Sequence, residues 1–175
     1  MKKNKLFFVS LGCDKNRVDS ERMLGLLEAA GFSFTDDEFE ADVIVVNTCC
    51  FIEDAKMESI DMILEMAAMK TEGKCRKLIV AGCLSERYRD EILSEFPEVD
   101  AYIGTSDLTE ILTVCKLDDE DITSIPIPGR IITTPGHYEF LKIAEGCNKY
   151  CTYCIIPYIR SEEHTSELQS QDGIS

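Results

Sequence analysis

The sequence has no apolar stretch long enough to cross a membrane as a helix, which takes about 20 residues. The amino-terminal run LFFVSLGC, at residues 6–13, is short and is followed at once by charged residues. Ser10 occupies the position where a lipoprotein signal carries leucine. We therefore expect neither export nor a membrane partner.

Positive charge is also scarce, because 18 Lys and Arg residues stand against 33 Asp and Glu residues, and the net charge is −15 at pH 7. An acidic surface repels nucleic acid and suits a basic protein as partner. A nucleic-acid partner is therefore not expected for this chain. Nine cysteines in 175 residues, about 5%, are too few for a disulfide scaffold. We interpret them as reduced metal ligands of a cytoplasmic protein.

Three of these cysteines lie close together in the run GCNKYCTYC. This cysteine triplet, Cys147, Cys151 and Cys154, has enough thiolates for three irons of a four-iron cluster, which is normally closed by four cysteines. The fourth iron would stay open for a substrate or a cofactor. Zinc is the alternative, but structural zinc sites are closed by four ligands from paired knuckles, and the sequence has no second C-x2-C pair. The spacing favours iron and sulfur.

Three further cysteines each follow an apolar run that is typical of a buried parallel strand. The runs are 6–11, 43–46 and 78–81, and the strand-end cysteines are Cys13, Cys49 and Cys83. Ligands bind outside the carboxyl ends of the strands in an open α/β sheet, so we expect these thiols to meet at one edge. Gly12 and Gly82 suit the turns there, since a residue without Cβ lets backbone come close to a bulky ligand.

A free cysteine is otherwise a small buried hydrophobe, and this is the alternative for each strand-end cysteine taken alone. Cys50, Cys75 and Cys115 have no such placement, and we interpret them as packing or surface residues. Alternation of strands with helical patterns predicts an open parallel sheet flanked by helices. The predicted helices cover residues 18–30, 57–67, 86–95 and 107–116, and a further strand is expected at 101–104.

Changes in composition divide the chain into four parts. The α/β domain covers residues 1–118, and an acidic, proline-containing linker covers 119–136. A further unit with one strand, at about 139–144, covers 137–159. Residues 160–175 contain the string RSEEHTSELQS, which looks like a translated sequencing adaptor, so we expect this tail to be non-native. His164 and the two glutamates before it are accordingly not expected to be ligands or acid–base groups.

Four blocks of the sequence resemble the methylthiotransferases, a family of radical S-adenosylmethionine enzymes. SLGCDKNRVDSE at 10–21, VVNTCCFIEDAK at 45–56 and AGCLSERY at 81–88 are similar to the amino-terminal domain of that family. HYEFLKIAEGCNKYCTYCIIP at 137–157 is similar to the start of its radical domain. The resemblance implies an open parallel sheet followed by the first piece of a partial barrel.

The resemblance also implies two [4Fe-4S] clusters. The strand-end cysteines would hold an auxiliary cluster, at whose open iron the sulfur for transfer is attached and methylated. The cysteine triplet would hold the radical cluster, which cleaves S-adenosylmethionine with an electron from a donor. Tyr153 stands where the family often places an aromatic near the adenine, although an ordinary packing tyrosine is the alternative. No catalytic side chain is assigned beyond the cluster ligands, and Asp19, Asn47 and Thr48 lie near the proposed edge with roles left open.

The form GCDKN at residues 12–16 is similar to the family branch that modifies an aspartate of a small-subunit ribosomal protein. The branch that modifies transfer-RNA adenosine typically carries GCQMN there, and its reaction is the first alternative. An iron–sulfur electron-transfer module and a structural zinc or plain α/β domain are the others. Because only one barrel strand is expected, we expect this chain alone to be inactive.

Overall fold

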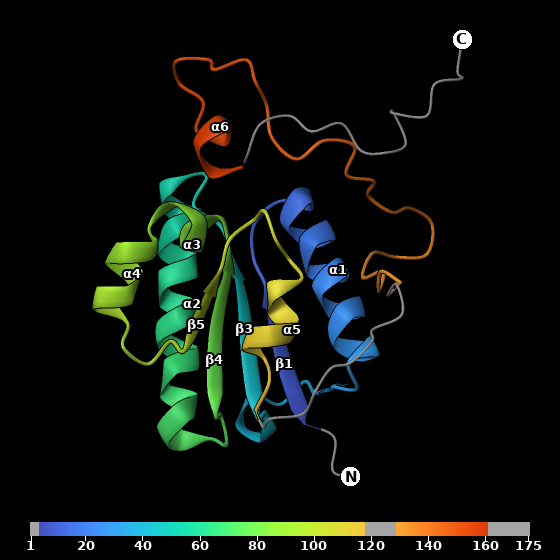
Figure 1. Cartoon of the computed structure of the whole chain (residues 1–175), viewed down its shortest axis with the longest axis vertical. Helices are drawn as coiled ribbons and strands as arrows, with labels where there is room; N and C mark the ends of the chain where they lie inside the picture. The colour runs from blue at the N-terminus through green and yellow to red at the C-terminus, as the bar shows by residue number, and fades with distance from the viewer. Residues whose placement is uncertain (1–3, 118–128, 161–175) are drawn as a thin grey trace.

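The computed structural model describes residues 4–117 and 129–160. Five parallel strands form one sheet in the order β2-β1-β3-β4-β5 (Figure 1). The strands are β1 (Lys5–Ser10), β2 (Ser33–Phe34), β3 (Val43–Thr48), β4 (Lys77–Gly82) and β5 (Ala101–Ile103). The helices are α1 (Asp14–Ala29), η1 (Glu38–Glu40), α2 (Glu53–Glu72), α3 (Cys83–Arg87), α4 (Arg89–Glu95), α5 (Glu110–Val114) and α6 (Ile156–Ile159). The predicted open parallel α/β sheet is confirmed.

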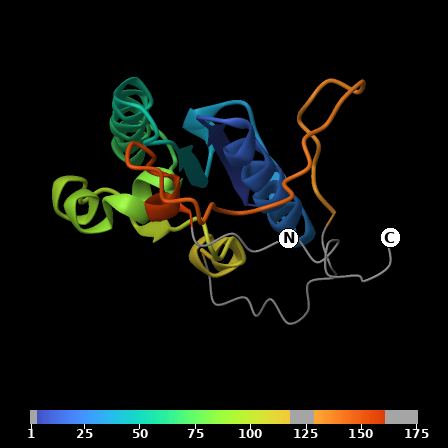
Figure 2. The same cartoon turned by 90° about the horizontal axis from the view of Figure 1, so that it is seen from above.

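The central strand β3 is buried along its whole length, as a parallel strand is when helices cover both faces of the sheet. Successive side chains of a strand point to opposite faces. Ile44 and Val46 therefore pack in one core with α2 and α4, and Val43 and Val45 pack in the other with α1 and α5. Figure 2 shows α2 and α4 on one side of the sheet and α1 on the other.

Two predicted helices differ from those in the structure. The helix expected at 86–95 is divided into α3 and α4 by Tyr88, whose φ of −121° and ψ of 30° interrupt the helical backbone. The helix expected at 107–116 is shortened to α5. The two-residue strand β2 has no periodic sequence pattern and was not predicted. None of the described helices is long and apolar enough to cross a membrane.

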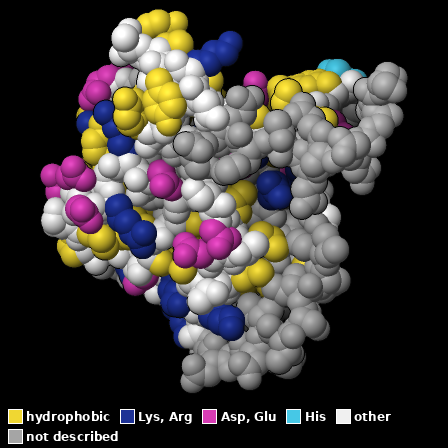
Figure 3. Space-filling model, turned by 45° about the horizontal axis from the view of Figure 1, so that its top comes forward, with side chains coloured by type: hydrophobic (Ala, Val, Ile, Leu, Met, Phe, Trp, Pro, Cys, Tyr) yellow, Lys and Arg dark blue, Asp and Glu magenta, His cyan; other side chains and the backbone are white. Residues whose placement is uncertain are grey.

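The predicted strand at 139–144 is wrong, since residues 139–143 have no regular structure and Ala144 forms only an isolated bridge. A strand needs a neighbour for its backbone hydrogen bonds, and the five described strands of the sheet pair among themselves. Leu141 and Ile143 are accordingly exposed. Exposed hydrophobic side chains also gather over α6 (Figure 3).

Residues 118–128, which include the first part of the predicted linker, 119–128, lie outside the described residues. The last part of the linker packs tightly along α1, where a Cβ added to Gly25 would come within 3.0 Å of the Gly129 carbonyl carbon. The Thr133 amide and hydroxyl both donate to Glu21 Oε1, over 2.7 and 2.8 Å. Arg130 Nε lies 2.9 Å from Glu21 Oε2. The fully buried Glu21 therefore anchors this segment to the sheet domain.

Candidate functional site

The three strand-end cysteines follow three adjacent strands of the sheet. Cys13 is the residue before α1, Cys49 follows β3 and Cys83 begins α3 directly after β4. The strands end level, because Ser10 is paired with Asn47 and Thr48 is paired with Gly82. The prediction that these cysteines share the carboxyl edge of the sheet therefore agrees with the strand order β1-β3-β4.

Two glycines allow close approach at this edge. Gly12 has φ +91°, and a Cβ there would lie 2.6 Å from the Cβ of Cys49 and 3.0 Å from its Sγ. Gly82 has φ +94°, and a Cβ there would lie 2.5 Å from the Thr48 carbonyl oxygen. Backbone with positive φ favours glycine, so both positions combine a conformational and a steric requirement. The Cys49 side chain therefore lies against the backbone of Gly12, and β3 lies against the backbone of Gly82.

Buried amides hold the strand ends together. Asn16, from the first turn of α1, donates from Nδ2 to the carbonyl oxygens of Leu11 (3.1 Å) and Thr48 (2.8 Å). Asn47 donates from Nδ2 to the Asn16 carbonyl oxygen, over 3.0 Å, and to Ser20 Oγ, over 2.8 Å. The Thr48 hydroxyl donates to the Ala81 carbonyl oxygen, over 2.6 Å. The open roles of Asn47 and Thr48 are therefore structural ties between neighbouring strand ends.

Asn16 was missed by the sequence analysis as a site residue, although the GCDKN run contains it. Its Oδ1 lies 3.5 Å from Cys83 Sγ, so its amide links α1 to the cysteine at the end of β4. Only the fold brings these residues together, because they are 67 positions apart in the sequence.

The strand-end cysteines differ in environment. Cys13 is exposed, while Cys49 and Cys83 are buried. Burial raises the pKa of the Cys83 thiol to about 12, although the nearby Arg160 guanidinium opposes this shift. Cys50 is buried beside them and donates from Sγ to the Cys83 carbonyl oxygen, over 3.2 Å. Cys75 and Cys115 are buried elsewhere in the two cores, in agreement with a packing role.

The cysteine triplet lies on a loop before α6. Cys147 and Cys154 are partly exposed, and Cys151 is exposed. The Cys154 amide donates to the Cys151 carbonyl oxygen, over 2.9 Å, which closes a turn between two of the three. Tyr153 is 91% exposed, so its predicted contact with an adenine stays a prediction. Within residues 4–117 and 129–160, no group of three His, Cys, Asp or Glu side chains is arranged to hold a metal ion.

A buried ion network joins this loop to α1. Arg160 Nη1 lies 2.9 Å from Asp19 Oδ2 and 2.6 Å from Glu145 Oε1. Lys142 also pairs with both carboxylates. Burial by itself would raise the pKa of Glu145, but Lys142 and Arg160 outweigh it and hold that pKa below its ordinary value. Lys15 Nζ donates to the carbonyl oxygens of residues 144 and 145, over 3.1 and 2.8 Å.

Arg160 is the first residue of the predicted non-native tail, and its contacts place it with the preceding unit. The Arg160 side chain is 2% exposed. The rest of the predicted tail, residues 161–175, lies outside the described residues. The network also gives Asp19, whose role was left open, two cationic partners. Lys142, Glu145 and Arg160 were missed by the sequence analysis, because single charged residues in an irregular segment carry no periodic signal.

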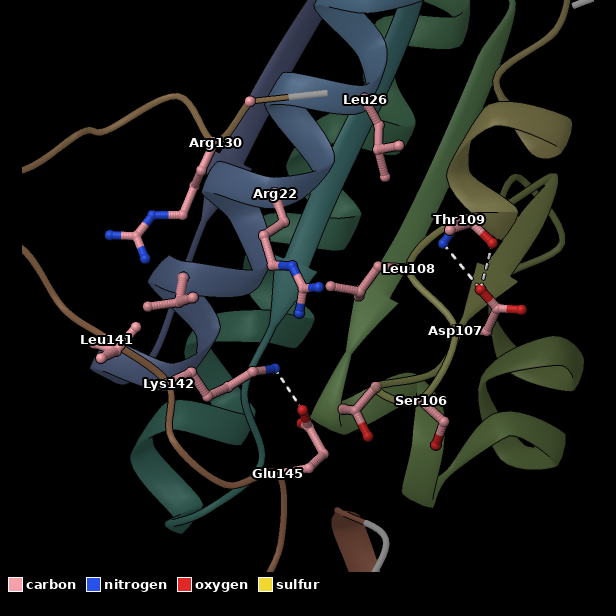
Figure 4. Close-up of a pocket in the computed structure, with 13 residues that line it drawn as sticks. Arg22, Leu26, Ser106, Asp107, Leu108, Thr109, Arg130, Leu141, Lys142 and Glu145 are labelled. Atoms are coloured by element: carbon pink, nitrogen blue, oxygen red, sulfur yellow. Dashed lines mark hydrogen bonds and ion pairs between the residues drawn. The ribbon is translucent and has the colours of Figure 1, made fainter. Parts of the chain in front are cut away.

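A cavity of about 560 Å3 opens beside the ion network (Figure 4). Its walls come from α1, from the loop after β5 and from the segments around residues 129–130 and 141–145. Arg22 points from α1 into this space toward Leu108, and Lys142 on the facing segment reaches Glu145. The cavity therefore lies where the carboxyl-terminal segments cross the sheet domain.

Comparison with known proteins agrees with this geometry. The uncharacterized protein family UPF0004 matches residues 5–104, which include all three strand-end cysteines. The chain belongs to this family. It is also similar to proteins described as "Ribosomal protein uS12 methylthiotransferase RimO". The resemblance to methylthiotransferases, drawn from the sequence blocks, is confirmed.

Three of these RimO relatives show the extent of the similarity. The relative from Lachnoclostridium phytofermentans is 56% identical over 94% of this chain and 40% of its own length. Those from Caldicellulosiruptor saccharolyticus and Sorangium cellulosum are 52% and 49% identical, over 89% and 96% of this chain and 38% and 36% of their own lengths. This UPF0004 member therefore spans about 40% of the length of the curated relatives it matches.

The match to the Sorangium protein leaves out 4% of the chain, which is fewer residues than the predicted tail contains. The similarity therefore continues past Ile159, where we expected it to end. That residues 161–175 are non-native stays a prediction.

Proposed function

We propose that this chain is the amino-terminal part of a RimO-type enzyme that adds a methylthio group to an aspartate of ribosomal protein uS12. The placement of the strand-end cysteines after three adjacent strands, β1, β3 and β4, carries this proposal. Identity of 56% to a uS12 methylthiotransferase supports it. The net charge of −15 also suits a basic ribosomal protein better than an RNA substrate.

The strand-end cysteines would hold an auxiliary [4Fe-4S] cluster and the cysteine triplet the radical cluster. Thiolates are the ligands that such clusters require, and Gly12 and Gly82 keep the backbone at this edge free of Cβ atoms. Bound clusters and S-adenosylmethionine would supply the homolytic chemistry that sulfur insertion at an unactivated carbon needs. S-adenosylmethionine and an electron donor are therefore proposed partners, in a cytoplasm that keeps the thiols reduced.

The chain's own residues would fix the positions of the ligands. Asn16 and Asn47 tie the three strand ends, so that the cysteines following them keep a constant spacing. The pairing of Asp19 with Lys142 and Arg160 would hold the triplet-bearing loop over that edge. Such fixed placement of both sites is what tight positioning of a reacting carbon requires.

The test is an anaerobic assay with reductant, S-adenosylmethionine and uS12. We compare this chain with a chimera in which residues 1–160 are followed by the carboxyl-terminal part of the Lachnoclostridium relative. The chimera should methylthiolate the uS12 aspartate, and the chain alone should not, since it spans about 40% of the length of that relative. A chimera that loads iron but modifies transfer-RNA adenosine instead would show that the substrate is assigned wrongly.

A further inference from the structure

Four charged side chains are buried together where the carboxyl-terminal segment meets α1. The side chains of Asp19, Lys142 and Arg160 are 4%, 7% and 2% exposed, and Glu145 is also mostly covered. Burial of charge is unfavourable unless each ion is paired and hydrogen-bonded. Two cations and two carboxylates meet this condition among themselves, so the network depends on each of its members.

Arg160 is the member that reaches beyond the network. Its Nη1 contacts Asp19 and Glu145, whereas its Nη2 donates to Asn16 Oδ1, over 2.6 Å, and lies 3.8 Å from Cys83 Sγ. The planar fork of a guanidinium presents several donors in fixed directions. One side chain therefore contacts α1, the segment just before the cysteine triplet, and the thiol at the end of β4.

We propose that Arg160 is a positioning residue that joins the triplet-bearing loop to the strand-end site and places a positive charge and an N–H donor against the Cys83 sulfur. The proposal rests on the proposed function, because only there is Cys83 a cluster ligand. Hydrogen bonds to ligand sulfurs and local charge set the reduction potentials of iron–sulfur sites. Arg160 would thereby set the potential of the auxiliary site as well as the position of the loop.

The remaining contacts of α6 agree with this arrangement. Ile159 is buried in the core on the α2 side, and its carbonyl oxygen accepts from the Thr105 hydroxyl over 3.0 Å. The backbone just before Arg160 is thus fixed independently of the ion network. An Arg160 variant should consequently lose the side-chain contacts without detaching α6 from the sheet domain.

The first measurement uses the metal-free chain. Hydrogen–deuterium exchange of residues 144–154 should rise about tenfold or more in Arg160→Gln, because Lys142 alone then faces the two carboxylates of Asp19 and Glu145. Arg130→Gln is the matched control, since Arg130 is a mostly buried arginine that pairs with the buried Glu21 and contacts the carboxyl-terminal segment at Glu139 and Phe140, outside the measured peptides. Exchange of the same peptides should be unchanged in the control.

The second measurement uses the anaerobically reconstituted chain. The midpoint potential of the auxiliary site should fall in Arg160→Gln, because reduction adds negative charge that the variant no longer compensates. Arg160→Lys keeps the positive charge, so its midpoint potential should lie nearer to that of the unaltered protein. Arg130→Gln should leave the potential unchanged.

Equal exchange in Arg160→Gln and the unaltered chain would overturn the joining role, and equal potentials in loaded proteins would overturn the role at Cys83. If the unaltered chain loads no iron, the proposed function and the part of the proposal at Cys83 both fail. The exchange measurement then still decides whether Arg160 joins the segments.

Discussion

Replacing Gly82 with alanine should destabilise the domain more than the same change at another glycine with positive φ. Gly82 has φ +94° and ψ −156°, a region that is essentially restricted to glycine. Forcing alanine into it costs about 1–3 kcal/mol. The new Cβ would also lie 2.5 Å from the carbonyl oxygen of Thr48, which is fully buried in the paired strand β3 and cannot move aside.

Gly31 is the matched control, because its φ is +92° and a Cβ there would have no atom within 4 Å. Gly31→Ala should therefore cost about 1–2 kcal/mol from backbone conformation alone. Gly82→Ala should cost about 2–5 kcal/mol, since overpacking adds about 1–3 kcal/mol. Urea unfolding followed by circular dichroism measures both values. Equal destabilisation by the two variants would refute the close approach of β4 to β3 at this edge.

Three further predictions concern other parts of the fold. Burial raises the pKa of the Cys115 thiol to about 12, so this thiol ionises at lower pH in the unfolded chain than in the folded chain. The free energy of unfolding should therefore fall by up to about 1.4 kcal/mol per pH unit from about pH 9 toward 12. Cys115→Ala should reduce that slope, measured by urea unfolding at each pH. Asn16→Ala should cost about 1–3 kcal/mol, because it removes a hydrogen bond to the buried Thr48 carbonyl oxygen, and an unchanged urea midpoint would contradict this. Glu21→Gln should increase proteolysis of residues 129–134, since it removes the buried counter-charge of Arg130 and leaves the exposed carboxylate of Glu139 as its acidic partner. A wild-type cleavage rate would contradict the anchor.

The sheet and its cysteine edge could be predicted because the relevant signals are local. Apolar runs followed by Gly-Cys or Asn-Thr-Cys indicate strand ends, and the parallel topology brings such ends to one edge. The break at Tyr88 and the short strand β2 depend on tertiary packing and left no periodic pattern. The strand expected at 139–144 failed because its apolar residues need a partner strand to become regular structure.

The supporting residues of the site could not be predicted, because their contacts join distant segments. Asn16 and Cys83 are 67 positions apart, and Asn16 and Arg160 are 144 apart. The unusual composition after Ile159 also led the sequence analysis to place Arg160 in a non-native tail. Its burial among Asp19 and Glu145 appears only in the folded structure.

The claim that the strand-end cysteines hold a cluster is tested most directly by measuring the iron and sulfide bound per chain after anaerobic reconstitution. The unaltered chain is compared with Cys83→Ala and with Cys75→Ala, which removes a buried thiol away from the strand ends. One cluster at the auxiliary site corresponds to about four irons per chain. Cys83→Ala should lose most of these irons, while its circular dichroism spectrum stays the same as that of the unaltered chain. Cys75→Ala should keep that iron. Full loading of Cys83→Ala together with loss of iron in Cys75→Ala would contradict the assignment of the strand-end cysteines.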